Sequence, residues 1–189
     1  MNKLKSFLFV TAMLVDVGAN AQFSFGLKAG LNLSTITNTE NTKMQFGYKA
    51  GPSVEYAFEP NMAVQSGLFL SSQRMKAKKT NFKTEANYLQ LPVCFAYKIP
   101  IASNAKMYLN AGPYFAYGLF GKSDFGFDRK EDTFGGDNLE NFDMGATFGA
   151  GAEVFKFNLG LNYDFGITEV WKDSKSRNSN FWFSVGYKF

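Results

Sequence analysis

Residues 23–33 read FSFGLKAGLNL, and large apolar residues occupy every second position along them. Phe23, Phe25 and Leu27 alternate with small or polar residues such as Lys28. A period of two places these two sets on opposite faces of a β-strand. The segment therefore predicts a strand with one apolar face and one polar face.

The same alternation recurs along the rest of the chain. It predicts seven further strands, at residues 46–56, 62–73, 88–99, 107–120, 142–154, 157–165 and 181–189. Short connections at 59–61, 101–105 and 155–156 alternate with long polar stretches at 34–45, 74–86, 121–141 and 166–180. Short turns at one end and long loops at the other are typical of outer-membrane barrels. We therefore predict an all-β fold, an eight-stranded antiparallel up-and-down transmembrane β-barrel.

Alternation alone does not separate a membrane barrel from a soluble lipocalin-like binding barrel, so the size of the side chains has to decide. An eight-stranded barrel has an interior just wide enough to be filled by side chains. The rings of the apolar face would overfill it, so we expect them to face lipid. The interior polar cluster would then contain Lys28, Lys49, Glu55, Gln65, Asp143, Glu153, Asp164 and Lys188, with opposite charges pairing.

The N-terminal segment has the pattern of a cleavable signal peptide. Two lysines precede an apolar run at residues 7–15, and a small-x-small pattern ends at Ala21. That run is too short to cross a bilayer as a helix. We therefore expect cleavage between Ala21 and Gln22, with residues 1–21 as the signal peptide and residues 22–189 as an outer-membrane β-barrel domain.

The composition excludes several kinds of chemistry. The chain of 189 residues contains no histidine, and Cys94 is its only cysteine. Ser-His and Cys-His nucleophiles, histidine-ligated metals and intrachain disulfides are therefore excluded. The net charge of +4 is too small to indicate a nucleic acid as partner. We expect no catalytic residue, no metal site and no cofactor, and so no enzyme.

Two surface features suggest partners. The last segment alternates Phe181, Phe183, Val185, Tyr187 and Phe189 and ends on an aromatic residue, which resembles the signal that the barrel assembly machinery recognises during biogenesis. The second long polar stretch carries the cations Arg74, Lys76, Lys78, Lys79 and Lys83. If this stretch faces outward, these cations could contact lipopolysaccharide phosphates. The alternative is an ordinary solvated loop.

Five short motifs in order resemble the PorT-like outer-membrane β-barrel family of Bacteroidetes. They are GLKAGLN at 26–32, YLQLP at 88–92, GPY at 112–114, FDMG at 142–145 and GAG at 149–151. The resemblance implies a small eight-stranded barrel in the outer membrane, similar to the OmpX and OmpA transmembrane barrels. The family is functionally broad, and its namesake is linked to protein secretion.

Three functions therefore stay open at this point. The leading hypothesis is a non-enzymatic barrel with a structural or interaction role, whose extracellular loops contact outer-membrane lipid, lipopolysaccharide or other envelope proteins. The first alternative is a narrow channel or an accessory component of a secretion or transport system. The second is the soluble lipocalin-like binding barrel.

Overall fold

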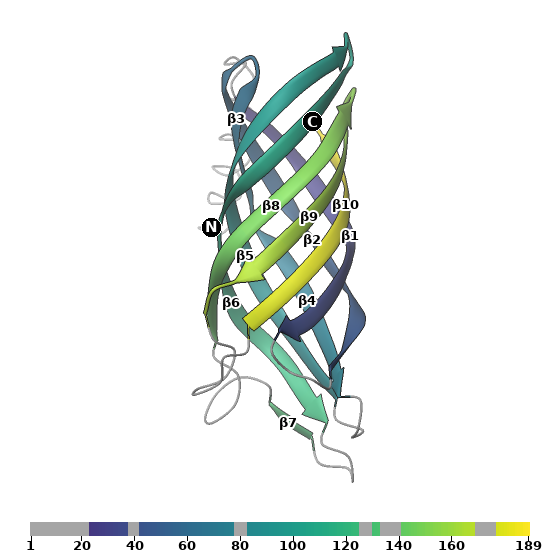
Figure 1. Ribbon diagram of the computed structural model, residues 1–189, viewed down its shortest axis with the longest axis vertical. Helices are drawn as coiled ribbons and strands as arrows, with labels where there is room; N and C mark the ends of the chain where they lie inside the picture. The colour runs from purple at the N-terminus through teal and green to yellow at the C-terminus, as the bar shows by residue number, and fades with distance from the viewer. Residues whose placement is uncertain (1–22, 38–41, 78–82, 125–129, 133–140, 169–176) are drawn as a thin grey trace, which may run out of the picture.

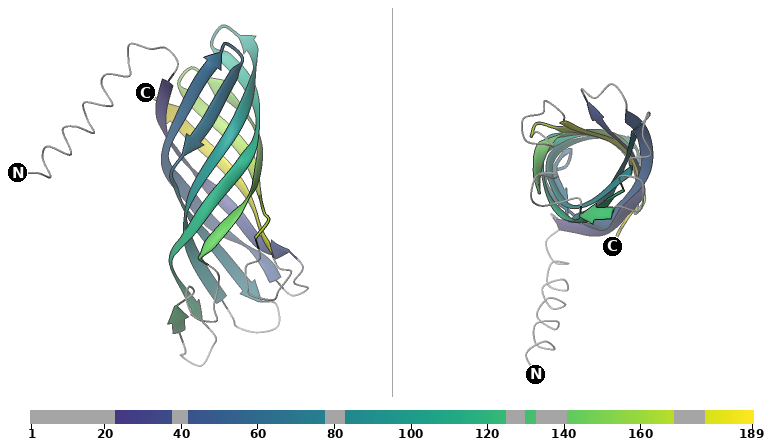
Figure 2. Two further views of the ribbon diagram at one scale, coloured as in Figure 1. Left: turned by 90° about the vertical axis from the view of Figure 1, so that its left-hand side faces the viewer. Right: turned by 90° about the horizontal axis from the view of Figure 1, so that it is seen from below.

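The computed structural model describes residues 23–37, 42–77, 83–124, 130–132, 141–168 and 177–189. Its strands are β1 (Phe23–Thr37), β2 (Thr42–Glu59), β3 (Met62–Gly67), β4 (Phe69–Ala77), β5 (Lys83–Ala102), β6 (Ala105–Asp124), β7 (Lys130–Asp132), β8 (Phe142–Val154), β9 (Phe157–Gly166) and β10 (Arg177–Lys188). Every ladder is antiparallel, and pairing of β1 with β10 closes the sheet into a ring (Figure 1, Figure 2). Among the described residues, no helix has the length and apolarity needed to cross a membrane.

Strands β3 and β4 together form a single strand of the barrel wall, interrupted at Leu68. Both keep the same register against β5, where Ser66 pairs with Val93 and Phe69 with Gln90. The Leu68 amide donates to the Pro52 carbonyl over 3.0 Å, but proline has no N–H to return the bond. Counting β3 and β4 together, the described chain contains eight wall strands, so the predicted eight-stranded barrel is confirmed; the short β7 is an addition that pairs only with β6.

The apolar face of the sheet lies outside. Along β1, Leu31 is 62% exposed while its neighbour Asn32 is fully buried. Phe148 and Phe183 are likewise exposed on β8 and β10. The interior holds more rings than the sequence suggested, because Trp182 and several tyrosines also point inward. Small neighbours make room for these rings. The expectation that bulky rings face outward therefore holds for the apolar face as a whole and not for each aromatic residue.

The three predicted short turns lie at one end of the barrel, here called the turn end. They are formed at residues 60–61, 103–104 and 155–156. The other ends of the strands, between which the long connections run in sequence, lie at the opposite end, here called the loop end (Figure 1). Phe189 lies at the turn end, where its amide donates to the Phe25 carbonyl of β1 over 2.9 Å. By the usual pattern of such barrels, the turn end faces the periplasm.

The predicted loop boundaries were wrong at the loop end, because the strands run further than their apolar alternation. Arg74 and Lys76, assigned to a loop, lie in β4, and Lys83 lies in β5. Lys78 and Lys79 lie outside the described residues. Backbone pairing needs no apolar side chains, so strands continue into a polar region that the alternation does not mark. The predicted signal peptide and its cleavage point also lie outside the described residues.

Candidate functional site

The polar interior of the barrel is the candidate site. The eight residues of the predicted interior cluster all lie on the inner face; six are buried, and Lys28 and Lys188 are partly buried. The cluster left out Lys98, which is also buried. Its position between outward-facing Tyr97 and Ile99 was the signal that could have found it.

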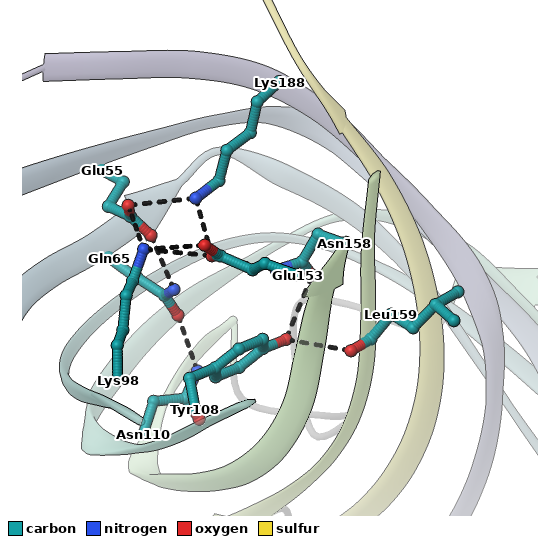
Figure 3. A network of polar contacts seen from close by, with 9 residues as sticks. All are labelled: Glu55, Gln65, Lys98, Tyr108, Asn110, Glu153, Asn158, Leu159 and Lys188. Carbon is teal, nitrogen blue, oxygen red and sulfur yellow. Dashed lines mark hydrogen bonds and ion pairs between the residues drawn. The ribbon is translucent and has the colours of Figure 1, made fainter. Parts of the chain in front are cut away.

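A four-charge network crosses the lumen near the turn end (Figure 3). Lys98 Nζ bonds Glu55 Oε1 and lies 2.9 Å from Glu153 Oε2. Lys188 Nζ lies 3.0 Å from Glu55 Oε1 and 2.6 Å from Glu153 Oε1. Each lysine therefore contacts both carboxylates, and the two pairs of opposite charges balance. The four residues come from β2, β5, β8 and β10, so the network links strands on several sides of the barrel.

Neutral side chains extend this network toward the middle of the barrel. Gln65 donates to Glu55 over 2.8 Å and accepts a bond of 2.8 Å from Asn110. The Tyr108 hydroxyl donates to Asn158 Oδ1 over 3.0 Å. These bonds satisfy polar groups that would otherwise be costly to bury.

A second ion pair occupies the middle of the lumen. Lys49 Nζ lies 3.0 Å from Asp164 Oδ2, and both side chains are almost fully buried. Gln90 and Thr147 donate to the same carboxylate over 3.0 and 2.8 Å. The Lys49 ammonium also lies 4.3 Å from the centre of the Trp182 ring, a cation–π distance.

A third cluster surrounds Asp143 toward the loop end and contains no lysine. The Tyr114 hydroxyl donates to Asp143 over 3.1 Å, and the Asn178 amide donates over 2.9 Å. The Thr168 hydroxyl donates to the other carboxylate oxygen. Three neutral donors therefore hold this carboxylate in place.

The described interior includes a larger and a smaller cavity. The larger, of about 320 Å³, is open at the turn end, and its lining includes Lys106 and the whole four-charge network. The smaller, of about 30 Å³, lies deeper, beside Lys28 and Trp182. No group of three or more acidic or cysteine side chains suited to a metal ion occurs among the described residues. Cys94 is buried and unpaired.

The predicted surface features lie as follows. On the outer wall of β10, Phe181, Phe183, Val185 and Tyr187 are exposed, and Phe189 follows the strand. At the loop end, Arg74 Nε lies 3.3 Å from Glu85 Oε2, and both side chains are largely exposed.

The backbone register adds a feature that the sequence does not show. Lys76 of β4 pairs with Lys43 of β2 on one side and with Lys83 of β5 on the other. Residues directly opposite each other lie on the same face of a sheet. Three lysine positions therefore stand side by side across three strands at the loop end.

The comparisons agree with this geometry. A family model described as an outer membrane protein β-barrel domain matches residues 18–172. The chain belongs to this family. It is therefore a small outer-membrane β-barrel, and with its apolar face outside, the soluble lipocalin-like alternative is wrong.

Several solved barrels share the fold at low sequence identity. Ail, the attachment invasion locus protein of Yersinia pestis, is 13% identical with a TM-score of 0.52, covering 89% of this chain and 99% of its own. Neisserial surface protein A is 16% identical with a TM-score of 0.53, covering 88% and 97%. The outer membrane enzyme PagL is 11% identical with a TM-score of 0.56, covering 86% and 98%. No curated protein matches the chain.

Proposed function

We propose that this protein is a non-enzymatic outer-membrane barrel that passes no solute and acts through its loop end, where it binds the anionic groups of lipopolysaccharide. The observation that carries the proposal is the filled lumen. Charged layers around Glu55 and Asp164 lie one behind the other, each held by ion pairs. An eight-stranded lumen has little room left for a continuous water path past such layers.

The loop end supplies the binding chemistry. The backbone register places Lys43, Lys76 and Lys83 in one row at the loop end, near the Arg74–Glu85 pair, with Asp124 as the next position of the row. Lysines attract phosphate groups, and this end faces the outer leaflet if the turns face the periplasm. Other envelope proteins are the alternative partners for the same surface.

The absence of histidine from the sequence supports a non-enzymatic role. The interior carboxylates are also engaged by lysines or neutral donors, including the two that line the cavity open at the turn end. The likeness to PagL concerns the fold alone. Within the family, the ordered motifs at 26–32 and 88–92 support a place among the PorT-like barrels of Bacteroidetes, with an accessory role in secretion as a second candidate.

Single-channel recording tests the closed lumen. Purified protein is reconstituted in planar bilayers, and we expect no current steps beyond those of a protein-free bilayer. The Lys98→Ala/Glu153→Ala double variant serves as the control, because it removes one charge of each sign from the network and should admit small currents. Regular steps from the wild-type protein would contradict the proposal and favour a channel.

Charge reversal tests the partner. We expect the Lys76→Glu/Lys83→Glu variant to retain several-fold less lipopolysaccharide on purification, and the difference should shrink at high salt. The control is Lys156→Glu, which reverses a charge at an exposed turn of the turn end and should leave the bound lipopolysaccharide unchanged. Equal retention by both variants would overturn the proposed partner.

A further inference from the structure

The cavity of about 30 Å³ in the barrel interior has an unusual lining. Its charged lining residues are Lys28 and Lys49, both cations, and no carboxylate lines it. Its volume suits one particle about the size of a water molecule. Lys28 has space beside it, since its register partners on β2 and β10 are Gly51 and Gly186.

The carboxylates of the described interior are engaged elsewhere. Glu55 and Glu153 are shared by Lys98 and Lys188. Lys49 has Asp164 as its partner, and Asp143 is held by neutral donors. Lys28 forms no ion pair or hydrogen bond with any described residue. Glu55 and Glu153 interact with Lys28 electrostatically but make no contact with it. A cation inside a barrel without a contacting counter-charge is costly, so a contacting anion would stabilise Lys28.

A second donor lines the same cavity without a partner. The Trp182 side chain is 5% exposed, and its indole Nε1–H makes no hydrogen bond in the described structure. One acceptor, Asn110 Oδ1, is also unpaired there. The Asn110 amide group, in contrast, is occupied by its bond to Gln65. The groups at this cavity without a hydrogen-bond partner therefore include two donors, the Lys28 ammonium and the Trp182 indole N–H, and one of them carries a positive charge.

We propose that this cavity binds a single halide ion, chloride under ordinary conditions, between the Lys28 ammonium and the Trp182 indole N–H. The ion supplies the charge that Lys28 lacks and accepts the hydrogen bond that Trp182 has free. A halide accepts hydrogen bonds from several directions, which fits donors that come from β1 and β10. The small volume of the cavity favours a monatomic anion over a larger one such as phosphate.

Bromide quenching of Trp182 tests the site directly. The chain has two tryptophans, so Trp171→Phe leaves Trp182 as the sole reporter. The protein is folded into detergent at a series of bromide concentrations, with gluconate holding the ionic strength constant. We expect quenching that saturates with bromide and is reversed when chloride competes.

Two lysine variants in the same background separate the site from general quenching. Lys28→Met should lose the saturable component, or show affinity weaker by at least about tenfold, because a charge-assisted bond is removed. Lys106→Met removes an equal charge at the turn end and should keep the component unchanged. Quenching that rises linearly and equally in all three proteins would overturn the proposal.

Diffraction supplies a readout that depends on no variant. Crystals of the wild-type protein grown in bromide should show an anomalous peak in the cavity between Lys28 and Trp182. A well-defined water there without anomalous signal would overturn the halide site and identify the cavity as a hydration site. Neither outcome depends on whether the loop end binds lipopolysaccharide.

Discussion

Lys98 is the residue whose removal should cost the barrel most. Its ammonium contacts both Glu55 and Glu153, and its side chain is 7% exposed. Removing one partner from a buried ion pair typically costs about 3–5 kcal/mol, because it leaves an uncompensated charge. We expect Lys98→Met to lower the free energy of unfolding by about 3 kcal/mol, measured by urea titration in lipid vesicles. Lys156→Met, at an exposed turn outside the network, should change it little, and equal stability of the two variants would argue against the network.

Cys94 should behave as an inert buried thiol. Its side chain is 4% exposed and faces the lumen. We expect a maleimide to label it only after unfolding. Ser103→Cys, at an exposed turn, should label at once in the folded protein and serves as the control. Rapid labelling of Cys94 in the native barrel would show that the lumen admits reagents.

Alternation along single strands predicted most of the charged residues that face inward, with Lys98 left out. It could not predict their partners. Glu55 and Glu153 lie on β2 and β8, and they meet only because the closed ring brings Lys98 and Lys188 between them. The sequence also could not predict that Lys28 has no contacting counter-charge, since this depends on how the interior carboxylates are engaged.

At the scale of elements, β8 and β9 come close together beneath the Tyr108 ring. Gly151 pairs with Gly160, and a Cβ at Gly151 would collide with that ring and with the Leu159 carbonyl. We expect Gly151→Val to destabilise the barrel by about 1–3 kcal/mol through overpacking. The matched change Ala150→Val, on the exposed face, should be nearly neutral. Urea midpoints measure both, and a neutral Gly151→Val would contradict the close packing.

The sequence predicted the number and order of the wall strands but not their length. The apolar alternation stops where the outer surface of the barrel becomes polar. Backbone pairing, in contrast, continues to Ala77 in β4 and begins at Lys83 in β5. Leu68 is a different case. Pro52 could have signalled the break, but only together with the register that places the two residues opposite each other.

For the whole molecule, ring closure predicts resistance to mild denaturation. Backbone groups in the membrane are paired around the ring, and no unpaired edge separates β1 from β10. We expect unboiled protein in detergent to migrate differently from boiled protein on a gel, with a β-rich circular dichroism spectrum before boiling. Identical mobility with soluble behaviour in the absence of detergent would contradict the membrane barrel.

The position of Lys188 links the four-charge network to the closure of the barrel. This lysine lies on β10, the strand that closes the ring against β1. Until β10 docks beside β1, Glu55 and Glu153 have only Lys98 between them. The seam between β1 and β10 and the charge balance of these four residues are therefore completed together, because the lysine that balances the second carboxylate lies on the closing strand.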